Sequence, residues 1–277
     1  MYGRLNEMIF VATVVVLLFI FGAAIGSFLN VVIYRTQTGE SWVYGRSKCE
    51  QCHTQICWYD NIPVVSFLIL GGKCRSCHAK LSYSHPVVEG LMGLLFVWWY
   101  IVGFVFFQLS QQPFVFLQPL FWLIVGVVLL YIVIIDYKYM LIPETAVVFL
   151  TALVVLYRIA LTAAGIMQLN DFLIAISGMA ATVLFFWGLW YITKGKGFGF
   201  GDVQLAVPLA LLVGWPELLV WVFISFVLGA VVGLCLIALK LARFGKPIPF
   251  GPFLILGACI SLIWGNYLVA WYVTLIS

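Results

Sequence analysis

The sequence predicts an all-α protein that crosses a membrane about eight times and carries one metal-binding loop after its first helix. The first observation is composition, because 65% of the residues are apolar and only 9% are charged. Soluble domains carry about 25% charged residues, so this chain cannot cover itself with a water-exposed surface. The second is a series of long apolar runs, and the third is a pair of cysteine motifs in the only large loop.

The apolar runs predict the membrane helices in order along the chain. A span needs about 20 largely apolar residues, and lipid offers no partner to an open backbone, so each span should be helical. The expected segments are Met8–Tyr34, Val87–Phe107, Pro119–Ile135, Glu144–Leu161, Phe172–Ile192, Val203–Trp215, Leu218–Leu241 and Pro252–Ile276. The first run has no charge and is longer than the apolar part of a signal peptide, so we expect it to be retained.

The segment Val203–Trp215 is short and contains Pro208, so a re-entrant hairpin is the alternative to a full span. The distribution of positive charge favours the span. With eight spans and both termini outside, all of the 14 Lys and Arg residues except Arg4 and Arg158 fall on one side, which the charge rule identifies as cytoplasmic. If Val203–Trp215 did not cross the membrane, the loop that contains Lys240, Arg243 and Lys246 would lie on the outer side. The net charge of +4 is too small to indicate a nucleic-acid partner.

The loop after the first span, residues 35–86, contains two C-x-x-C motifs that predict a structural zinc site. Its four candidate ligands are Cys49, Cys52, Cys74 and Cys77. Four thiolates complete the tetrahedron that zinc prefers, and a loop this small needs such a centre to hold its shape. Disulfides are disfavoured in a cytoplasmic loop. Cys57, Cys235 and Cys259 are expected to act as small apolar residues.

Haem attachment is the alternative for this loop. Both motifs continue as C-x-x-C-H, with His53 and His78, and this string is also the signature of c-type haem attachment. A cytochrome would need the loop on the outer side and further axial ligands, for which His85 is the only other histidine. The charge distribution therefore favours zinc.

Two aspartates lie at the same predicted membrane edge. Asp136 closes the third span, and Asp202 opens the sixth within Gly199-Phe200-Gly201-Asp202. Ionisable groups at membrane depth are functional candidates, although interfacial carboxylates that reach water are the ordinary alternative. The glycines disfavour helix before Asp202 and would let an extended substrate backbone come close, so Gly199 and Gly201 are expected to form a substrate loop.

Paired carboxylates suit peptide hydrolysis. One ionised carboxylate takes a proton from water while its protonated partner donates to the scissile carbonyl. All three histidines lie in the loop, which leaves no histidine base for a serine or cysteine mechanism. The helix ends favour Asp202 as the base and Asp136 as the acid, since Asp202 lies at a positive helix end and Asp136 at a negative one.

Together these motifs resemble the type IV prepilin peptidase family, the membrane aspartic peptidases of the G-x-G-D class. The first span carries Gly26-Ser27-Phe28-Leu29-Asn30-Val31-Val32 with Arg35, and the loop carries Asn61-Ile62-Pro63 and Gly72-Lys73-Cys74-Arg75. Asp136 with Ile142-Pro143 and the Gly199–Asp202 segment resemble the two catalytic segments. The resemblance divides the chain into a first helix (1–34), a zinc loop (35–86) and a seven-helix peptidase core (87–277).

The resemblance implies a multi-pass protein of the bacterial inner membrane that serves a pilus or secretion system. Its substrates would be prepilins or pseudopilins whose short basic leader is cut on the cytoplasmic side. It also implies methylation of the new N-terminus with S-adenosylmethionine. One departure is Gln204, because the family usually has lysine there. A presenilin-like protease, which would show Tyr before the first aspartate where Ile135 stands, and a proton-coupled transporter are the alternatives.

Overall fold

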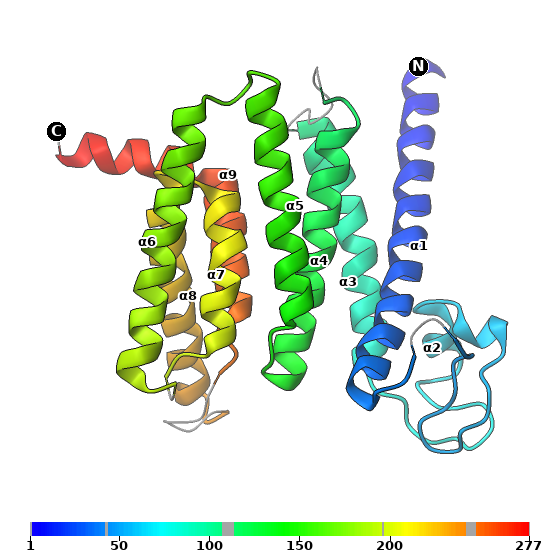
Figure 1. Cartoon of the computed structure of the whole chain (residues 1–277). Helices are drawn as coiled ribbons and strands as arrows, with labels where there is room; N and C mark the ends of the chain where they lie inside the picture. Colours follow the sequence, from blue (N-terminus) through cyan, green and yellow to red (C-terminus); the bar gives the residue numbers. More distant parts are fainter. Residues whose placement is uncertain (1, 42–43, 107–113, 196, 242–247, 277) are drawn as a thin grey trace. The chain divides into compact units, whose positions relative to one another are not determined.

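The computed structural model describes residues 2–41, 44–106, 114–195, 197–241 and 248–276, and within them it is helical apart from turns and two isolated bridges. The chain forms two compact units, Met1–Leu130 and Tyr131–Ser277. Figure 1 shows the path of the chain through the helices of each unit.

The first unit is built on two long helices that lie side by side. Helix α1 (Tyr2–Thr38) packs along α3 (Ser84–Trp98), which continues as the π-helix η2 (Trp99–Phe106). Two glycines of α1 make the close approach possible. A Cβ atom at Gly22 would lie 2.7 Å from the carbonyl oxygen of Met92, and one at Gly26 would lie 2.8 Å from Cα of Glu89. The glycine of the first-span motif is therefore a packing residue, as small residues at helix crossings in membranes often are.

Between these two helices the chain forms the cysteine loop. It contains the short helices η1 (Trp58–Asn61) and α2 (Val65–Ile69). The Arg35 side chain, which is buried, ties the start of the loop to the end of α1. Its guanidinium donates to the carbonyl oxygens of four loop residues, Ser41, Tyr44, Gly45 and Arg46.

The second unit contains the end of α4 (Leu117–Tyr139) and five further helices. These are α5 (Glu144–Ala163), α6 (Leu169–Thr193), α7 (Phe200–Val213), α8 (Glu217–Ala238) and α9 (Gly251–Ile276). Helix α7 is enclosed by α5, α6, α8 and α9. Its side chains Leu205 and Leu209 are fully buried, so protein rather than lipid surrounds this helix.

In the described part of the chain, seven helices are long and apolar enough to cross a membrane. The remaining expected span, Val203–Trp215, corresponds to α7, which has only 14 residues. Such a helix is about 21 Å long, whereas the hydrocarbon layer is about 30 Å thick. Figure 1 shows α7 running beside α6 as a single helix in the opposite direction, instead of a hairpin that turns back. The expected all-helical fold is confirmed, and the sixth expected span, α7, is shorter than the hydrocarbon layer of a bilayer.

Candidate active site and metal cluster

Asp136 lies in the last turn of α4 and is nearly buried, with 5% of its surface exposed. Its Oδ2 atom accepts a hydrogen bond of 3.0 Å from the backbone N–H of Gly251. Gly251 is the first residue of α9, so the end of one helix and the start of another hold this carboxylate.

Asp202 lies in the first turn of α7 and is 7% exposed. Its Oδ2 atom accepts a hydrogen bond of 3.2 Å from the N–H of Gly199, the residue that precedes the helix. An acidic side chain that bonds back to the N-cap N–H is a standard device for starting a helix. The Gly199 N–H is therefore bound to Asp202 and is not free to pair with a substrate backbone.

The two aspartates line one cavity of about 260 Å³. The other lining residues are Met140, Leu141, Ile142, Gly199, Phe200, Gly201 and Gln204. All four predicted active-site residues of this unit, the two aspartates and the two glycines, are thus brought together. Gln204, the position noted above as a departure from the resembled family, lines the same cavity.

Gly201 allows the segment after α4 to approach the start of α7. A Cβ atom at Gly201 would lie 3.0 Å from Cβ of Ile142, closer than side chains normally pack. The glycine pattern before Asp202 therefore reflects tight packing at this position.

The helix ends near Asp136 and Asp202 do not determine which aspartate is the acid and which is the base. Asp136 lies at the C-terminal end of α4, as predicted, but it also accepts an N–H at the N-terminus of α9. Asp202 accepts one N–H at the N-terminus of α7. Each carboxylate thus has a positive helix end beside it, and the predicted assignment of Asp202 as base and Asp136 as acid loses its basis.

The four predicted metal ligands form a cluster in the loop of the first unit. The Sγ atoms of Cys49, Cys52, Cys74 and Cys77 all lie within 4.8 Å of one another. Cys49 and Cys77 are 3.8 Å apart, and a tetrahedron with Zn–S bonds of about 2.3 Å has edges of about 3.8 Å. The cluster could therefore hold a metal such as zinc.

The two C-x-x-C motifs are near copies of one backbone turn. In each motif the backbone N–H of the histidine donates a hydrogen bond of 3.0 Å to the carbonyl oxygen of the first cysteine. The pairs are His53 with Cys49 and His78 with Cys74. Both histidines have left-handed φ values, 55° and 56°. The histidines therefore shape the turns, and the cysteines face one another instead of pairing separately with two haems.

Local hydrogen bonds prepare one thiol for a metal. The side chain and backbone of Thr54 lower the pKa of Cys52 to about 6, so this sulfur is largely a thiolate at neutral pH, the form that binds metals. The Ala79 backbone lowers the pKa of Cys77, but desolvation and hydrogen bonds from the other three cluster thiols together raise it to about 11.

Asp60 joins the two halves of the loop through an ion pair with Arg75. The Arg75 guanidinium donates to both of its carboxylate oxygens, with the shortest contact at 2.6 Å. Arg75 also lies over the ring of Tyr59 at 5.4 Å. This pairing holds the pKa of the Asp60 carboxyl below its usual value.

Comparison with known proteins accounts for both sites. A family model described as the bacterial peptidase A24 N-terminal domain matches residues 20–102, and one for the type IV leader peptidase family matches residues 123–234. The chain is 31% identical to a prepilin leader peptidase/N-methyltransferase of Aeromonas hydrophila, over 93% of each chain. The chain belongs to the prepilin leader peptidase/N-methyltransferase family. Proteins with the same name from Stutzerimonas stutzeri (32%, over 96% of this chain and 95% of the relative) and Pseudomonas aeruginosa (31%, over 91% and 90%) are similarly related.

A search of the solved structures found no match to the chain. Within the prepilin leader peptidase/N-methyltransferase family, the first matched region holds the cysteine cluster and the second holds both aspartates. The resemblance drawn from the sequence motifs is thereby confirmed. With its seven apolar helices of spanning length among the described residues, this family member is a multi-pass membrane protein.

Sequence reasoning missed Gly251, which lies beyond the region matched to the leader peptidase family model. The available signal was the segment Pro249-Phe250-Gly251-Pro252 at the start of the last span. Its contact with Asp136 joins residues 115 positions apart, and no local pattern reveals such a pair.

Replacing Gly251 with alanine is expected to lower the rate of leader cleavage by about 10²-fold, since a displacement of about 1 Å at a catalytic group has effects of this size. The added Cβ would lie 2.6 Å from Oδ2 of Asp136, so the carboxylate must move. Cleavage of a prepilin by the purified variant measures the effect. Gly188→Ala is the matched control, because a Cβ there meets nothing within 4 Å; equal rates for the two variants would contradict the positioning role.

Proposed function

We propose that this protein cleaves the short basic leader of type IV prepilins or pseudopilins with an aspartate dyad, Asp136 and Asp202. The observation that supports this most directly is their placement. Two nearly buried carboxylates from helices far apart in the sequence line one cavity, and each is oriented by a backbone N–H. Membership of a family whose relatives are named prepilin leader peptidases supports the substrate class.

The dyad would act by general acid–base catalysis. Two neighbouring carboxylates in a buried site favour a state in which they share one proton. The ionised member takes a proton from a water molecule, which attacks the carbonyl carbon of the scissile peptide bond. The protonated member donates its proton to the carbonyl oxygen. The carboxyl that took the proton of water then passes it to the leaving nitrogen, and the tetrahedral intermediate collapses as the first carboxylate takes back the hydroxyl proton, which releases the amine of the new N-terminus. The N–H groups of Gly199 and Gly251 keep both carboxylates in place during these transfers.

The orientation follows from the basic loops. The loop residues 35–86, Lys138 at the end of α4 and the segments after Thr193 and Ala238 carry 12 of the 14 Lys and Arg residues, and basic segments of this kind face the cytoplasm. We therefore place the protein in the bacterial cytoplasmic membrane with its dyad at the cytoplasmic face, where an uncleaved leader would be exposed.

A second activity would follow cleavage, the methylation of the new N-terminal amine by S-adenosylmethionine. The relatives named as N-methyltransferases support it. In this proposal zinc has a structural role: the four cysteines bind it and hold the cysteine loop in its folded form, because a closed site of four thiolates leaves no position for a substrate.

Mass spectrometry of the N-terminus of a co-expressed prepilin tests both activities in one measurement. We expect the leader to be removed and the new N-terminus to gain one methyl group. An intact leader would refute the peptidase assignment and favour a transporter that uses the two aspartates as a proton relay. Cleavage within the membrane segment of the substrate would instead indicate a presenilin-like protease.

A further inference from the structure

Helix α2 of the cysteine loop turns an apolar face outward. Val65, Leu68 and Ile69 have the spacing that places side chains on one face of a helix. All three are exposed, Leu68 by 71% and Ile69 by 75%. The adjoining helix η1 adds Trp58, which is 78% exposed. Large apolar side chains gathered in one region of a surface mark a contact with a partner or a membrane.

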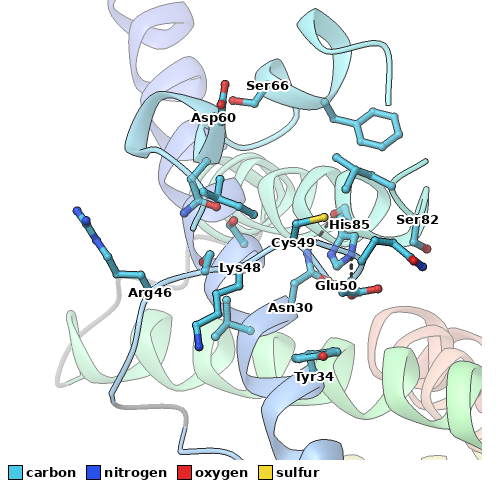
Figure 2. A pocket seen from close by; sticks show the side chains of 18 of the residues that line it. Asn30, Tyr34, Arg46, Lys48, Cys49, Glu50, Asp60, Ser66, Ser82 and His85 are labelled. Atoms are coloured by element: carbon cyan, nitrogen blue, oxygen red, sulfur yellow. Dashed lines mark hydrogen bonds and ion pairs between the residues drawn. The ribbon is translucent and has the colours of Figure 1, made fainter. Parts of the chain in front are cut away.

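The inner side of α2 is the polar one. Ser66 is buried, and its hydroxyl accepts from the N–H of Ile62 at 3.0 Å and donates to the carbonyl oxygen of Tyr59 at 2.9 Å. Figure 2 shows Ser66 directed from α2 toward the segment that carries Asp60. Ser66 and Phe67 line an internal cavity of about 430 Å³, to which the three outward residues do not belong. The polar and apolar sides of α2 are thus reversed relative to a helix that faces water.

The start of α2 is fixed beside the membrane-spanning helices. The N–H of Val64 donates to Oε2 of Glu89 at 2.7 Å, and Glu89 lies in the second turn of α3. Glu89 packs against Gly26 of α1, twelve residues before the helix ends at Thr38, which is about 18 Å of helix. In Figure 1, α2 is level with the last turns of α1. Helix α2 therefore lies alongside the two spans and not beyond their ends.

The backbone of Val64 shows that this position is held firmly. Its φ is 61°, a conformation that is strained for a β-branched residue. Such strain persists where the surrounding structure holds the residue in place. Here the N–H is bound by Glu89, and the carbonyl oxygen accepts from Leu68 in the first turns of α2. The outward face of α2 is thus presented in a fixed direction.

Two lysines lie close to the end of α2. Lys73 and Lys80 are opposite each other in an antiparallel bridge, and both are exposed. Like charges directly opposite each other repel, and among the described residues neither lysine forms an ion pair with a carboxylate. The preceding residue, Gly72, donates its N–H to the carbonyl oxygen of Phe67 in α2. An anion bound by both lysines would remove the repulsion.

We propose that the outward face of α2, with Trp58, rests in the lipid leaflet beside the cysteine loop, and that Lys73 and Lys80 bind phosphates of anionic lipids there. Tryptophan is enriched at the membrane interface. Residues 35–86 contain six Lys and Arg residues and three Asp and Glu residues, and this positive balance complements the anionic cytoplasmic leaflet. The inference goes beyond leader cleavage and methylation, and it involves neither aspartate of the dyad.

A second copy of the chain is the competing occupant of this face, and the geometry favours it less. A stable protein interface buries about 800 Å² on each partner, whereas α2 has only five residues. A lipid leaflet needs no such area, because α1 and α3 already keep the loop at the membrane. The face then needs only to be at the right depth, and its bond to Glu89 in α3 gives it that depth.

Photo-crosslinking in a bilayer tests the outward face. In the full-length protein, Ile69 is replaced by the photoreactive residue p-benzoylphenylalanine, and the protein is irradiated in nanodiscs of phosphatidylcholine and phosphatidylglycerol. We expect a phospholipid attached to the peptide that contains residue 69, identified by mass spectrometry. The same photoreactive residue in place of Gln55 is the control, because Gln55 is also exposed but belongs to the first cysteine turn. It should attach no more than background amounts of lipid.

The zinc content of each variant verifies that the loop is folded. Attachment at position 69 to a second copy, or to another segment of the same chain, would overturn the proposal. Equal amounts of lipid at the two positions would also overturn it, because exposure alone would then account for the label.

A lipid probe tests the two lysines. Nanodiscs of phosphatidylcholine contain a small amount of phosphatidylglycerol with a photoreactive headgroup, and label is measured in the peptides of residues 57–81. Lys73→Gln is expected to lower this label by about fivefold, the contribution of one basic residue at an anionic surface. A phosphatidylcholine probe should label these peptides less and should not respond to the substitution.

Lys48→Gln is the matched control for Lys73→Gln. Lys48 precedes Cys49 as Lys73 precedes Cys74, and it is also exposed, but its bridge partner is Gln55 instead of a lysine. We expect this variant to keep the label of the unmodified protein. Equal loss of label in the two variants, or no loss in either, would refute the binding of lipid phosphate by Lys73 and Lys80.

Discussion

Asparagine in place of either Asp136 or Asp202 is expected to reduce leader cleavage by about 10⁴-fold or more, while the protein still accumulates in the membrane. Residues that act as one catalytic unit lose nearly all activity when either is removed. Asparagine preserves size and can still accept the N–H of Gly251 or Gly199 through its side-chain oxygen. It cannot exchange a proton with water or substrate, so the loss should be chemical and not structural.

The comparison is made with purified variants and a synthetic or co-purified prepilin, at equal protein concentration. Asp171→Asn is the matched control, because Asp171 is also an aspartate in the first turn of a helix but is exposed and is not among the residues that line the cavity. The control should cleave at the normal rate. The double variant should be no worse than either single variant, and near-normal cleavage by either single variant would refute the dyad.

Loss of one cluster cysteine is expected to remove the metal and unfold the loop. We expect about one zinc per chain in the purified protein, because four thiolates form one closed tetrahedral site. Serine at Cys49 or Cys74 should lower the zinc content to background, as measured by plasma mass spectrometry. Because a loop of this kind depends on its metal for folding, residues 39–83 should also become sensitive to limited proteolysis.

Cys57→Ser provides the control, since Cys57 is exposed and does not belong to the cluster. Its zinc content and proteolysis pattern should match those of the unmodified protein. A haem absorbance band in place of zinc would contradict both the metal assignment and the cytoplasmic placement of the loop.

Features encoded by short motifs could be predicted from the sequence. The cysteine cluster follows from two C-x-x-C turns, and the pairing of Asp136 with Asp202 follows from their places at the ends of apolar runs. Hydropathy located the helices to within a few residues, because backbone groups in lipid must be satisfied within the helix. Hydropathy also located α7, because a helix buried among other helices has the same apolar residues as a helix exposed to lipid.

Features that depend on distant pairs could not be predicted in this way. The contacts of Gly251 with Asp136, Arg75 with Asp60 and Asn30 with His85 join separate segments. The histidines of the C-x-x-C-H strings were ambiguous because their role lies in backbone conformation, with φ near 55°, rather than in their side chains. The division of the chain into residues 1–34, 35–86 and 87–277 stays a prediction.

The enclosure of α7 has a consequence for how this enzyme would respond to its bilayer. Membrane proteins adjust to a change in hydrocarbon thickness by tilting or shifting their lipid-facing helices. Helix α7 carries Asp202 but is too short to match a bilayer and is shielded from it by its neighbours. Hydrophobic mismatch can therefore reach Asp202 only through the surrounding helices, so cleavage should vary little among vesicles made from lipids of different chain length.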